Sequence, residues 1–160
     1  MIRNQHLIFW KKKPDFVILA AAKVGGILAN KNFKDKFIYE NLQIQNNVIH
    51  GSHLASVKNL FLLGSSCIYP KLCKQPMKEK YLLTGELEKT NDAYSIAKIA
   101  GLKMCEFYSH VHKINYKTLM PPNLYGPNDN YDLNNSHFYP ALLKKIYDAK
   151  KNNKKFLNVW

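Results

Sequence analysis

Tyr94 and Lys98 stand four positions apart, a spacing that puts a phenol and an ammonium group on one face of a helix. The segment that follows Asp92, AYSIAKIAGLKMCEFY, has helical periodicity, and Asp92 is its expected N-cap. Side chains at this spacing lie one turn apart and can share a site. The same spacing recurs at Tyr147 and Lys151, where an exposed aromatic and a solvated lysine are the simpler interpretation. The spacing alone is therefore a weak signal.

Polar residues at the end of a buried strand strengthen the first pair. The apolar run of residues 60–63 stops at Gly64, which is typical of a strand covered on both faces of a parallel sheet. Ser65 and Cys67 follow at the carboxyl end of this strand, the edge where open α/β sheets bind ligands. The helix with the tyrosine and the lysine follows at a distance that lets it return beside this strand. We therefore expect these four side chains to form one site.

The serine, tyrosine and lysine resemble the Ser/Tyr-x-x-x-Lys set of the extended short-chain dehydrogenase/reductase superfamily, also called the NAD-dependent epimerase/dehydratase family. Five longer sequence motifs resemble the GDP-L-fucose synthase family within it. They occur in the same order as in that family, and the resemblance extends over residues 15–160. They are AAAKVGGI (20–27), GSSCIYPK (64–71), YSIAKIAG (94–101), NLYGPNDN (123–130) and NSHFYPALL (135–143).

This resemblance implies the conversion of GDP-4-keto-6-deoxymannose to GDP-L-fucose by epimerisation at C3 and C5 and NADPH-dependent reduction of the C4 ketone. Tyr94 would donate the proton to the ketone oxygen, with Ser65 as a second hydrogen-bond donor. Lys98 would lower the pKa of the phenol and hold the nicotinamide ribose. Cys67 would act as the base of the epimerisation, and His137 would return the proton. The complete protein would be a homodimer.

The resemblance also implies the positions that contact cofactor and substrate. Pro122 departs from the family pattern, because a threonine is usual there and proline lacks both a backbone N–H and a hydroxyl. One cofactor contact is therefore expected to differ. Lys145 and Trp160 match positions that contact the substrate. The positions that match cofactor contacts are Ala21, Leu63, Gly64, Ser65, Ser66, Lys98, Pro121, Pro122, Asn123, Leu124 and His137.

The order of apolar segments predicts an α/β fold, a partial Rossmann-like, doubly wound parallel sheet in a single partial domain of residues 1–160. Expected strands cover residues 15–21, 57–64 and 116–120, with a further strand starting at 156. Expected helices cover residues 32–56, 92–112 and 140–150, with a Pro/Asn/Gly-rich loop at 121–135. The first helix is expected to present Ile38, Leu42 and Ile49 on one face and Phe37, Ile44 and Val48 on the adjoining one.

The sequence contains no glycine-rich turn of the kind that binds a dinucleotide pyrophosphate. Its only glycine pair, Gly25 and Gly26, follows a segment that matches the fourth strand of the family. We therefore expect a central fragment without the N-terminal strands, in which the strand at 15–21 is a bare apolar edge. Such a chain is expected to self-associate when expressed alone and to bind no NADPH.

Composition favours no other class of function. The net charge is +13, but the lysines are scattered and interleaved with asparagine, so solvated faces are a better interpretation than a nucleic-acid partner. Cys67, Cys73 and Cys105 suggest neither a disulfide framework nor a metal site. No apolar run is long enough for a membrane span, and a cytoplasmic location is expected. The histidines expected to lie simply on helix surfaces are His50, His53, His110 and His112.

Two alternatives remain. The chain could belong to another nucleotide-sugar epimerase or dehydratase with the same serine, tyrosine and lysine, although the pairing of Cys67 with His137 favours double epimerisation. It could also be a non-catalytic remnant, or a module that pairs with a separately encoded N-terminal piece.

Overall fold

The computed structural model describes residues 13–133 and 136–159, and its centre is a parallel sheet of three strands. The strands are β1 (Phe16–Leu19), β2 (Asn59–Leu63) and β3 (Asn115–Leu119), and they lie in the order β1-β2-β3. Leu19 pairs with Leu62, and Leu62 in turn with Thr118. The α/β class and the parallel sheet are therefore as predicted, and the strands expected at 15–21, 57–64 and 116–120 are present.

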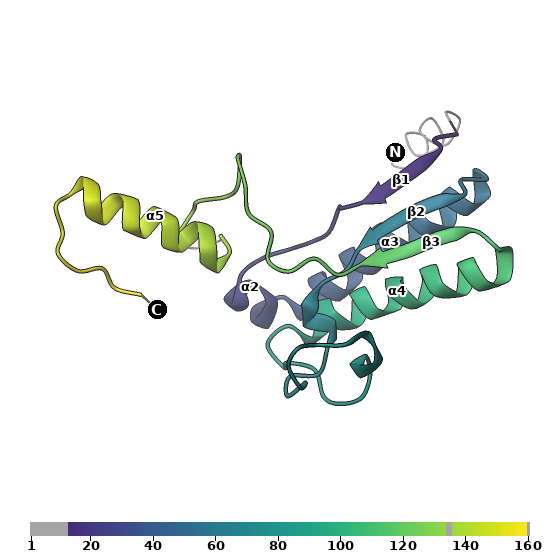
Figure 1. Ribbon diagram of the computed structural model, residues 1–160, viewed down its shortest axis with the longest axis horizontal. Coiled ribbons are helices and arrows are strands. Elements are labelled where there is room, and N and C mark those ends of the chain that lie inside the picture. The colour runs from purple at the N-terminus through teal and green to yellow at the C-terminus, as the bar shows by residue number, and fades with distance from the viewer. Residues whose placement is uncertain (1–12, 134–135, 160) are drawn as a thin grey trace.

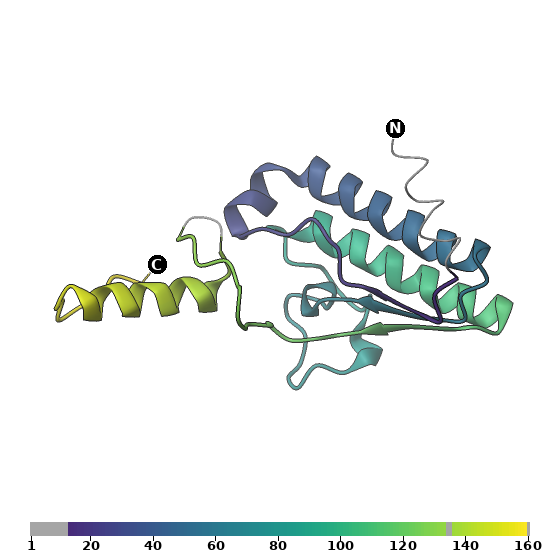
Figure 2. The same cartoon turned by 90° about the horizontal axis from the view of Figure 1, so that it is seen from above.

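Two long helices cover one face of the sheet. The helices are α2 (Ile27–Asn32), α3 (Lys34–Leu54), α4 (Asp92–His112) and α5 (Phe138–Lys151), with 3-10 turns η1 (Ser66–Ile68) and η2 (Glu79–Tyr81). Because α3 joins β1 to β2 and α4 joins β2 to β3, both crossovers return on the same side, where α3 and α4 lie next to each other (Figures 1 and 2). The short helix α2 was not predicted.

The core lies between the sheet and these two helices. Alternate strand residues point toward the helices and are buried together with Ile49 of α3 and Cys105 of α4; they are Val17, Leu19, Leu60, Leu62 and Tyr116. The intervening residues point to the other face, where Phe16 is 52% and Ile18 66% exposed. The described helices leave that face open, and β2 is the only strand partner of β1 in the described sheet. As predicted, β1 is an apolar edge strand.

The buried stripe of α3 differs from the predicted apolar faces, because polar side chains stand in it. Phe37, Asn41, Gln45 and Ile49 are its fully buried members with a spacing of four. Asn41 exchanges two hydrogen bonds with the backbone of Lys23, at 2.9 and 3.0 Å. The side-chain amide of Gln45 donates to the carbonyl of Ala97 in α4. These amides satisfy buried backbone groups of neighbouring segments, which outweighs their lower hydrophobicity.

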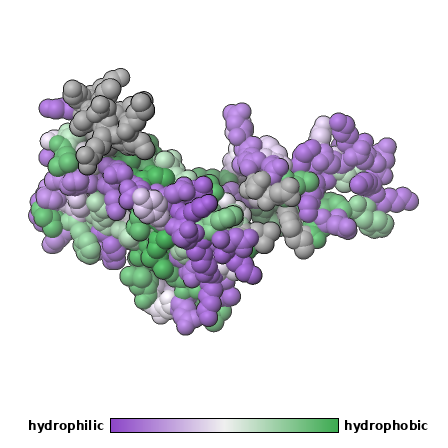
Figure 3. Space-filling view, turned by 180° about the vertical axis from the view of Figure 1, so that it is seen from behind, coloured by the Kyte–Doolittle hydropathy of each residue, from purple (hydrophilic) through white to green (hydrophobic). Residues whose placement is uncertain are grey.

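The C-terminal part forms an arm that leaves the body of the molecule. The chain after β3 runs through an irregular loop into α5, which lies beyond the sheet (Figure 1). In Figure 3 this arm projects to the right with a mostly hydrophilic surface. Residues 156–159 are irregular, so the predicted strand there is wrong over these residues. An isolated segment has no neighbouring strand to pair with.

Two smaller points concern helix ends and membrane segments. The N-cap of α4 is Asn91 and not Asp92, which lies in the first turn. The Asp92 carboxylate instead forms an ion pair with Lys34 at 2.8 Å. None of the helices in the described residues is both long and apolar enough to cross a membrane.

Candidate active site

The carboxyl end of β2 turns sharply into η1 and presents Ser65 and Cys67. Ser65 is the N-cap of η1, and its hydroxyl accepts a hydrogen bond from the Cys67 backbone N–H at 3.3 Å. Gly64 N–H donates to the Leu119 carbonyl at 2.7 Å, and a Cβ on this glycine would lie only 2.5 Å from the sulfur of Met120. Glycine therefore lets β2 and the end of β3 approach closely, and both polar residues are left half-buried.

The first two turns of α4 bring Tyr94 and Lys98 to the same strand end. Lys98 is only 4% exposed, and its ammonium donates to the carbonyl of Leu63, the last residue of β2, at 2.8 Å. The same nitrogen lies 5.8 Å from the centre of the Tyr94 ring. The structure thus gathers Ser65, Cys67, Tyr94 and Lys98 at one edge of the sheet, from a strand end and the following helix.

Burial controls the ionisation of the phenol and the ammonium group. Burial raises the pKa of Tyr94, the charge of an ionised Cys67 raises it further, and the Ser65 hydroxyl acts in the opposite direction. Burial also lowers the pKa of Lys98. We expected Lys98 to lower the pKa of the phenol, and in this structure the net direction is the reverse. The reason is that the ammonium contacts the Leu63 carbonyl, while the phenol is partly withdrawn from water.

Asn91 and Ser95 surround Cys67 and were not among the predicted site residues. The Asn91 side-chain amide donates to the Cys67 sulfur at 3.3 Å. The Ser95 hydroxyl donates to the Cys67 carbonyl at 2.8 Å. Helical spacing could have found them, because Asn91, Ser95 and Lys98 occupy one helix face at i, i+4 and i+7.

The positions that match cofactor contacts lie at the carboxyl ends of all three strands. Ala21 follows β1, Leu63 and Gly64 end β2, and residues 121–124 follow β3. Ala21, Ser66, Pro122, Asn123 and Leu124 are exposed, whereas Leu63, Gly64 and Pro121 are half-buried. These segments therefore border one edge of the sheet, next to Tyr94 and Lys98.

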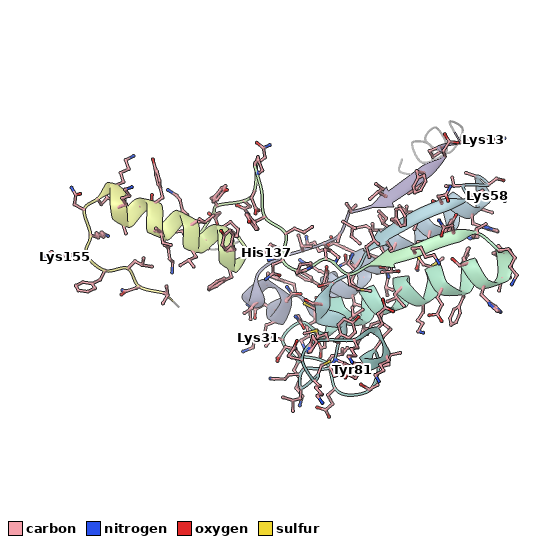
Figure 4. All side chains as sticks on the ribbon, viewed as in Figure 1. Lys13, Lys31, Lys58, Tyr81, His137 and Lys155 are labelled. Atoms are coloured by element: carbon pink, nitrogen blue, oxygen red, sulfur yellow. The ribbon has the colours of Figure 1, made fainter. Side chains whose placement is uncertain are left out.

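Two further predicted site residues, His137 and Lys145, lie on the arm. His137 is the exposed N-cap residue of α5, and Figure 4 shows it where the arm begins. The described part of the structure brings it into no contact with Ser65, Cys67 or Tyr94. Lys145 donates to the carbonyl of Asn158 at 3.1 Å, within the same arm. Trp160 is outside the described residues.

Comparison with known proteins identifies the family. The model of the NAD dependent epimerase/dehydratase family matches residues 3–159. The chain belongs to this family. A GDP-L-fucose synthase from Escherichia coli (strain K12) is 51% identical over 158 residues, covering 99% of this chain and 49% of the relative. A putative GDP-L-fucose synthase 2 from Arabidopsis thaliana is 55% identical over 152 residues, covering 95% of this chain and 46% of the relative.

Solved structures of the family share the fold of this chain. A GDP-D-glycero-L-gluco-heptose synthase from Campylobacter jejuni, solved with NADPH, has a TM-score of 0.86 and 44% identity, covering 92% of this chain and 44% of that chain. A GDP-L-fucose synthetase from Naegleria fowleri, bound to NADP, has a TM-score of 0.83 and 30% identity, covering 96% of this chain and 51% of that chain. The chain spans about half the length of these relatives.

The epimerase family is associated with a nicotinamide cofactor, and the residues present fit one half of it. The ammonium of Lys98 and the phenol of Tyr94 offer donors at a strand edge, next to residues that match cofactor contacts. A pyrophosphate site normally needs a glycine-rich turn before a helix N-terminus. Gly26 does precede α2, but this helix has only 6 residues and is not preceded by the expected glycine pattern. The chain thus fits the nicotinamide and its ribose.

A group of histidines lies at the other end of α3 and α4. The rings of His53 and His112 are 4.0 Å apart, and His50 Nδ1 lies 2.9 Å from the hydroxyl of Tyr108. These three histidines, expected only as surface residues, form a cluster in which burial and neighbouring charges lower the pKa of His53. Within the described residues, no group of three or more His, Cys, Asp or Glu is arranged to hold a metal ion.

Proposed function

We propose that this chain forms the catalytic centre of an NADPH-dependent enzyme that converts GDP-4-keto-6-deoxy-D-mannose to GDP-L-fucose. The observation that carries the proposal is the cluster of Ser65, Cys67, Tyr94 and Lys98 at the end of β2. The chain is also 51% identical to the matching half of a GDP-L-fucose synthase. The proposed substrate class is therefore a GDP-linked 4-keto sugar, and the proposed complete protein is a homodimer.

In the reduction, the sugar ketone oxygen would accept hydrogen bonds from Tyr94 and Ser65. The raised pKa of Tyr94 keeps its phenol protonated near neutral pH, as a proton donor must be. When bound, NADPH would supply the hydride that C4 accepts. Lys98, held by the Leu63 carbonyl, lies beside the phenol and would bind the nicotinamide ribose. Tyr94 then transfers its proton to the alkoxide oxygen, so the ketone becomes an alcohol.

In the epimerisation, Cys67 would remove a proton from C3 or C5, and the same two donors would stabilise the enolate oxygen. His137 would return a proton to the opposite side of the carbon. For this role the arm has to bring His137 to the cluster, so its assignment is a prediction of the resemblance. Lys145, which is also on the arm, and Trp160, which is outside the described residues, are proposed to contact the GDP part of the substrate.

A second candidate is a reductase that acts on a GDP-linked 4-keto sugar without epimerising it. The observation in its favour is that a GDP-6-OMe-4-keto-L-xylo-heptose reductase from C. jejuni is 46% identical, with a TM-score of 0.84. Such an enzyme would use Tyr94, Ser65 and Lys98 but would not need Cys67 as a base. Uptake of solvent deuterium at C3 and C5 distinguishes the two candidates.

The test is a chimaera in which residues 13–160 replace the matching half of the E. coli synthase. We expect it to oxidise NADPH in the presence of GDP-4-keto-6-deoxymannose and to form GDP-L-fucose with deuterium at C3 and C5 in D₂O. The matched control is the same chimaera with Tyr94→Phe. A folded chimaera that binds NADPH but consumes none with this substrate would overturn the proposal. Reduction without deuterium uptake would favour the second candidate.

A further inference from the structure

The side chain of Asn91 makes a contact that is unusual for its position. At the N-cap of a helix, asparagine normally accepts a hydrogen bond from a free backbone N–H of the first turn. Asn91 is the N-cap of α4, a helix of 21 residues, but its side chain makes no such bond. Its Nδ2 donates instead to the sulfur of Cys67 at 3.3 Å. A side chain that would ordinarily stabilise the helix end is thus directed at the cysteine.

A buried hydroxyl fixes the two partners relative to each other. Ser95, which is 0% exposed, donates to the carbonyl of Cys67 at 2.8 Å, and its oxygen also lies 3.1 Å from the carbonyl of Asn91. The main chains of Cys67 and Asn91 are therefore held against the same atom. This arrangement keeps the asparagine amide beside the sulfur, although the two residues are 24 positions apart.

The chemical effect of the contact follows from the charge of the acceptor. An N–H group forms a stronger hydrogen bond to a thiolate than to a thiol, so it favours the deprotonated sulfur. The ionisable groups on the first two turns of α4 are Asp92, Tyr94 and Lys98, and Glu88 lies shortly before this helix. Asp92 is paired with Lys34 at 2.8 Å and Glu88 with Lys71 at 2.7 Å. Among the described residues, Asn91 is the side chain that donates to this sulfur.

We propose that Asn91 is a positioning residue for Cys67, which holds the sulfur in place and stabilises its deprotonated form. In the epimerisation a C–H bond of the sugar breaks, its electron pair passes into the enolate, and the proton forms an S–H bond. The inference rests on the proposed function for the reaction, but the contact itself can be tested without substrate.

The experiment measures alkylation of each cysteine by iodoacetamide in the full 160-residue chain, over a range of pH. Trypsin cleaves after Lys58, Lys71 and Lys103, which places Cys67, Cys73 and Cys105 on different peptides. Asn91→Ser removes the donor and keeps a residue that suits an N-cap. We expect the pH midpoint of Cys67 alkylation to rise and its rate of alkylation at neutral pH to fall by about tenfold, because the thiolate loses a hydrogen-bond donor. Cys73 in the same sample should not change.

Two further variants separate this effect from a loosened structure. Asn91→Asp keeps the size of the side chain, replaces the donor by a carboxylate and should raise the midpoint further. Ser95→Ala removes the hydroxyl that holds the two main chains together but leaves the amide, so it should lower thermal stability and move the midpoint less than either Asn91 variant. A Cys67 midpoint that stays unchanged in both Asn91 variants overturns the inference.

The chimaera shows whether the contact matters for the reaction. If Asn91→Ser raises the midpoint and slows deuterium exchange at C3 and C5, the inference is supported. If it raises the midpoint but leaves exchange at its original rate, Cys67 is not the base, and both the catalytic role of Asn91 and that part of the proposed function are wrong. If the midpoint is unchanged while the chimaera makes GDP-L-fucose, only the inference about Asn91 fails.

Discussion

The predicted site residues fall into two regions that differ in how the chain holds them. In the body, Lys98 is buried and bonded to the end of β2, and Cys67 is contacted by two side chains of α4. On the arm, His137 is exposed, and Lys145 donates to the carbonyl of Asn158 in the segment after its own helix. The comparison teaches that Lys98 and the proposed base Cys67 are positioned by contacts within the body, whereas the residues on the arm depend on how the arm is placed.

The largest effect is expected from Tyr94→Phe in the chimaera. Loss of the hydroxyl removes the general acid, which contributes about 10²- to 10⁴-fold in typical enzymes, and leaves the packing of the ring unchanged. The matched change on the arm is Tyr125→Phe, in a ring that lies 4.6 Å from that of Tyr139. Substrate-dependent NADPH oxidation measures both. Near-normal turnover of Tyr94→Phe would show that the body does not supply the acid.

The next comparison is between Cys67→Ser in the body and His137→Asn on the arm. A serine hydroxyl is a much weaker base than a thiolate, so Cys67→Ser should slow exchange at both carbons by about two orders of magnitude. His137→Asn should impair proton return and leave proton removal intact. Deuterium uptake at C3 and C5, followed by NMR, separates the two steps. If both variants exchange hydrogens and form fucose at normal rates, neither residue belongs to the epimerisation site.

The stability of the two regions can be compared with a pair of glycine substitutions. A Cβ on Gly101 in α4 would lie 2.5 Å from the Gln45 side-chain oxygen, whereas nothing lies within 4 Å of a Cβ on Gly126. Gly101→Val should lower the free energy of unfolding by about 1–3 kcal/mol, because the buried amide of Gln45 is displaced. Gly126→Val should change it little. Urea unfolding measures both, and equal midpoints would contradict the packing seen around Gln45.

Self-association provides a fourth comparison. The open face of the sheet exposes Ile18 on an edge strand, while Ile146 is 46% exposed on the polar arm. We expect the 160-residue chain to associate through the sheet, so Ile18→Lys should shift it toward monomer and Ile146→Lys should not. Analytical ultracentrifugation gives the answer. An equal effect of the two lysine substitutions would assign the association to a different surface. A monomeric parent chain would exclude the association.

The smallest effect concerns pH. The pKa of His53 lies below its ordinary value of 6.5, first because of burial and then because of the charges of His112, His50 and Lys58. The unfolded chain therefore binds a proton more readily. The contribution of His53 to the free energy of unfolding is fully present above pH 6.5. It is lost as the pH falls through the lower pKa that His53 has in the folded state. His53→Asn should flatten the fall of the urea midpoint between neutral and mildly acidic pH, and His137→Asn should not.

Hydrophobic patterning predicted the elements well. The helix expected at residues 92–112 is α4, and the ends of the three described strands lie within two residues of the predicted ends. Hydrophobic periodicity did not predict the buried face of α3, where polar side chains form hydrogen bonds to the backbone of other segments. Asn41 and Gln45 are buried because backbone groups of Lys23 and Ala97 need partners, and a single-helix pattern contains no information about those groups.

The candidate site was predictable to a similar extent. The strand end and the helix spacing were enough to place Ser65, Cys67, Tyr94 and Lys98 together. The sequence could not show that Lys98 bonds to the Leu63 carbonyl, so the direction of the pKa of Tyr94 was not anticipated. The contact of Asn91 with Cys67 was not predictable either, since an asparagine before a helix normally bonds to the backbone of the first turn.

The hydrogen bond between Lys98 and Leu63 joins residues only 35 positions apart in the sequence. The bond between Asn91 and Cys67 joins residues 24 positions apart. Contacts of small sequence separation need little loop closure and form early in folding. During synthesis, β2, η1 and the first turns of α4 can therefore assemble before the arm has left the ribosome. The proposed catalytic centre would then form first, and the arm with its proposed substrate contacts would be added afterwards.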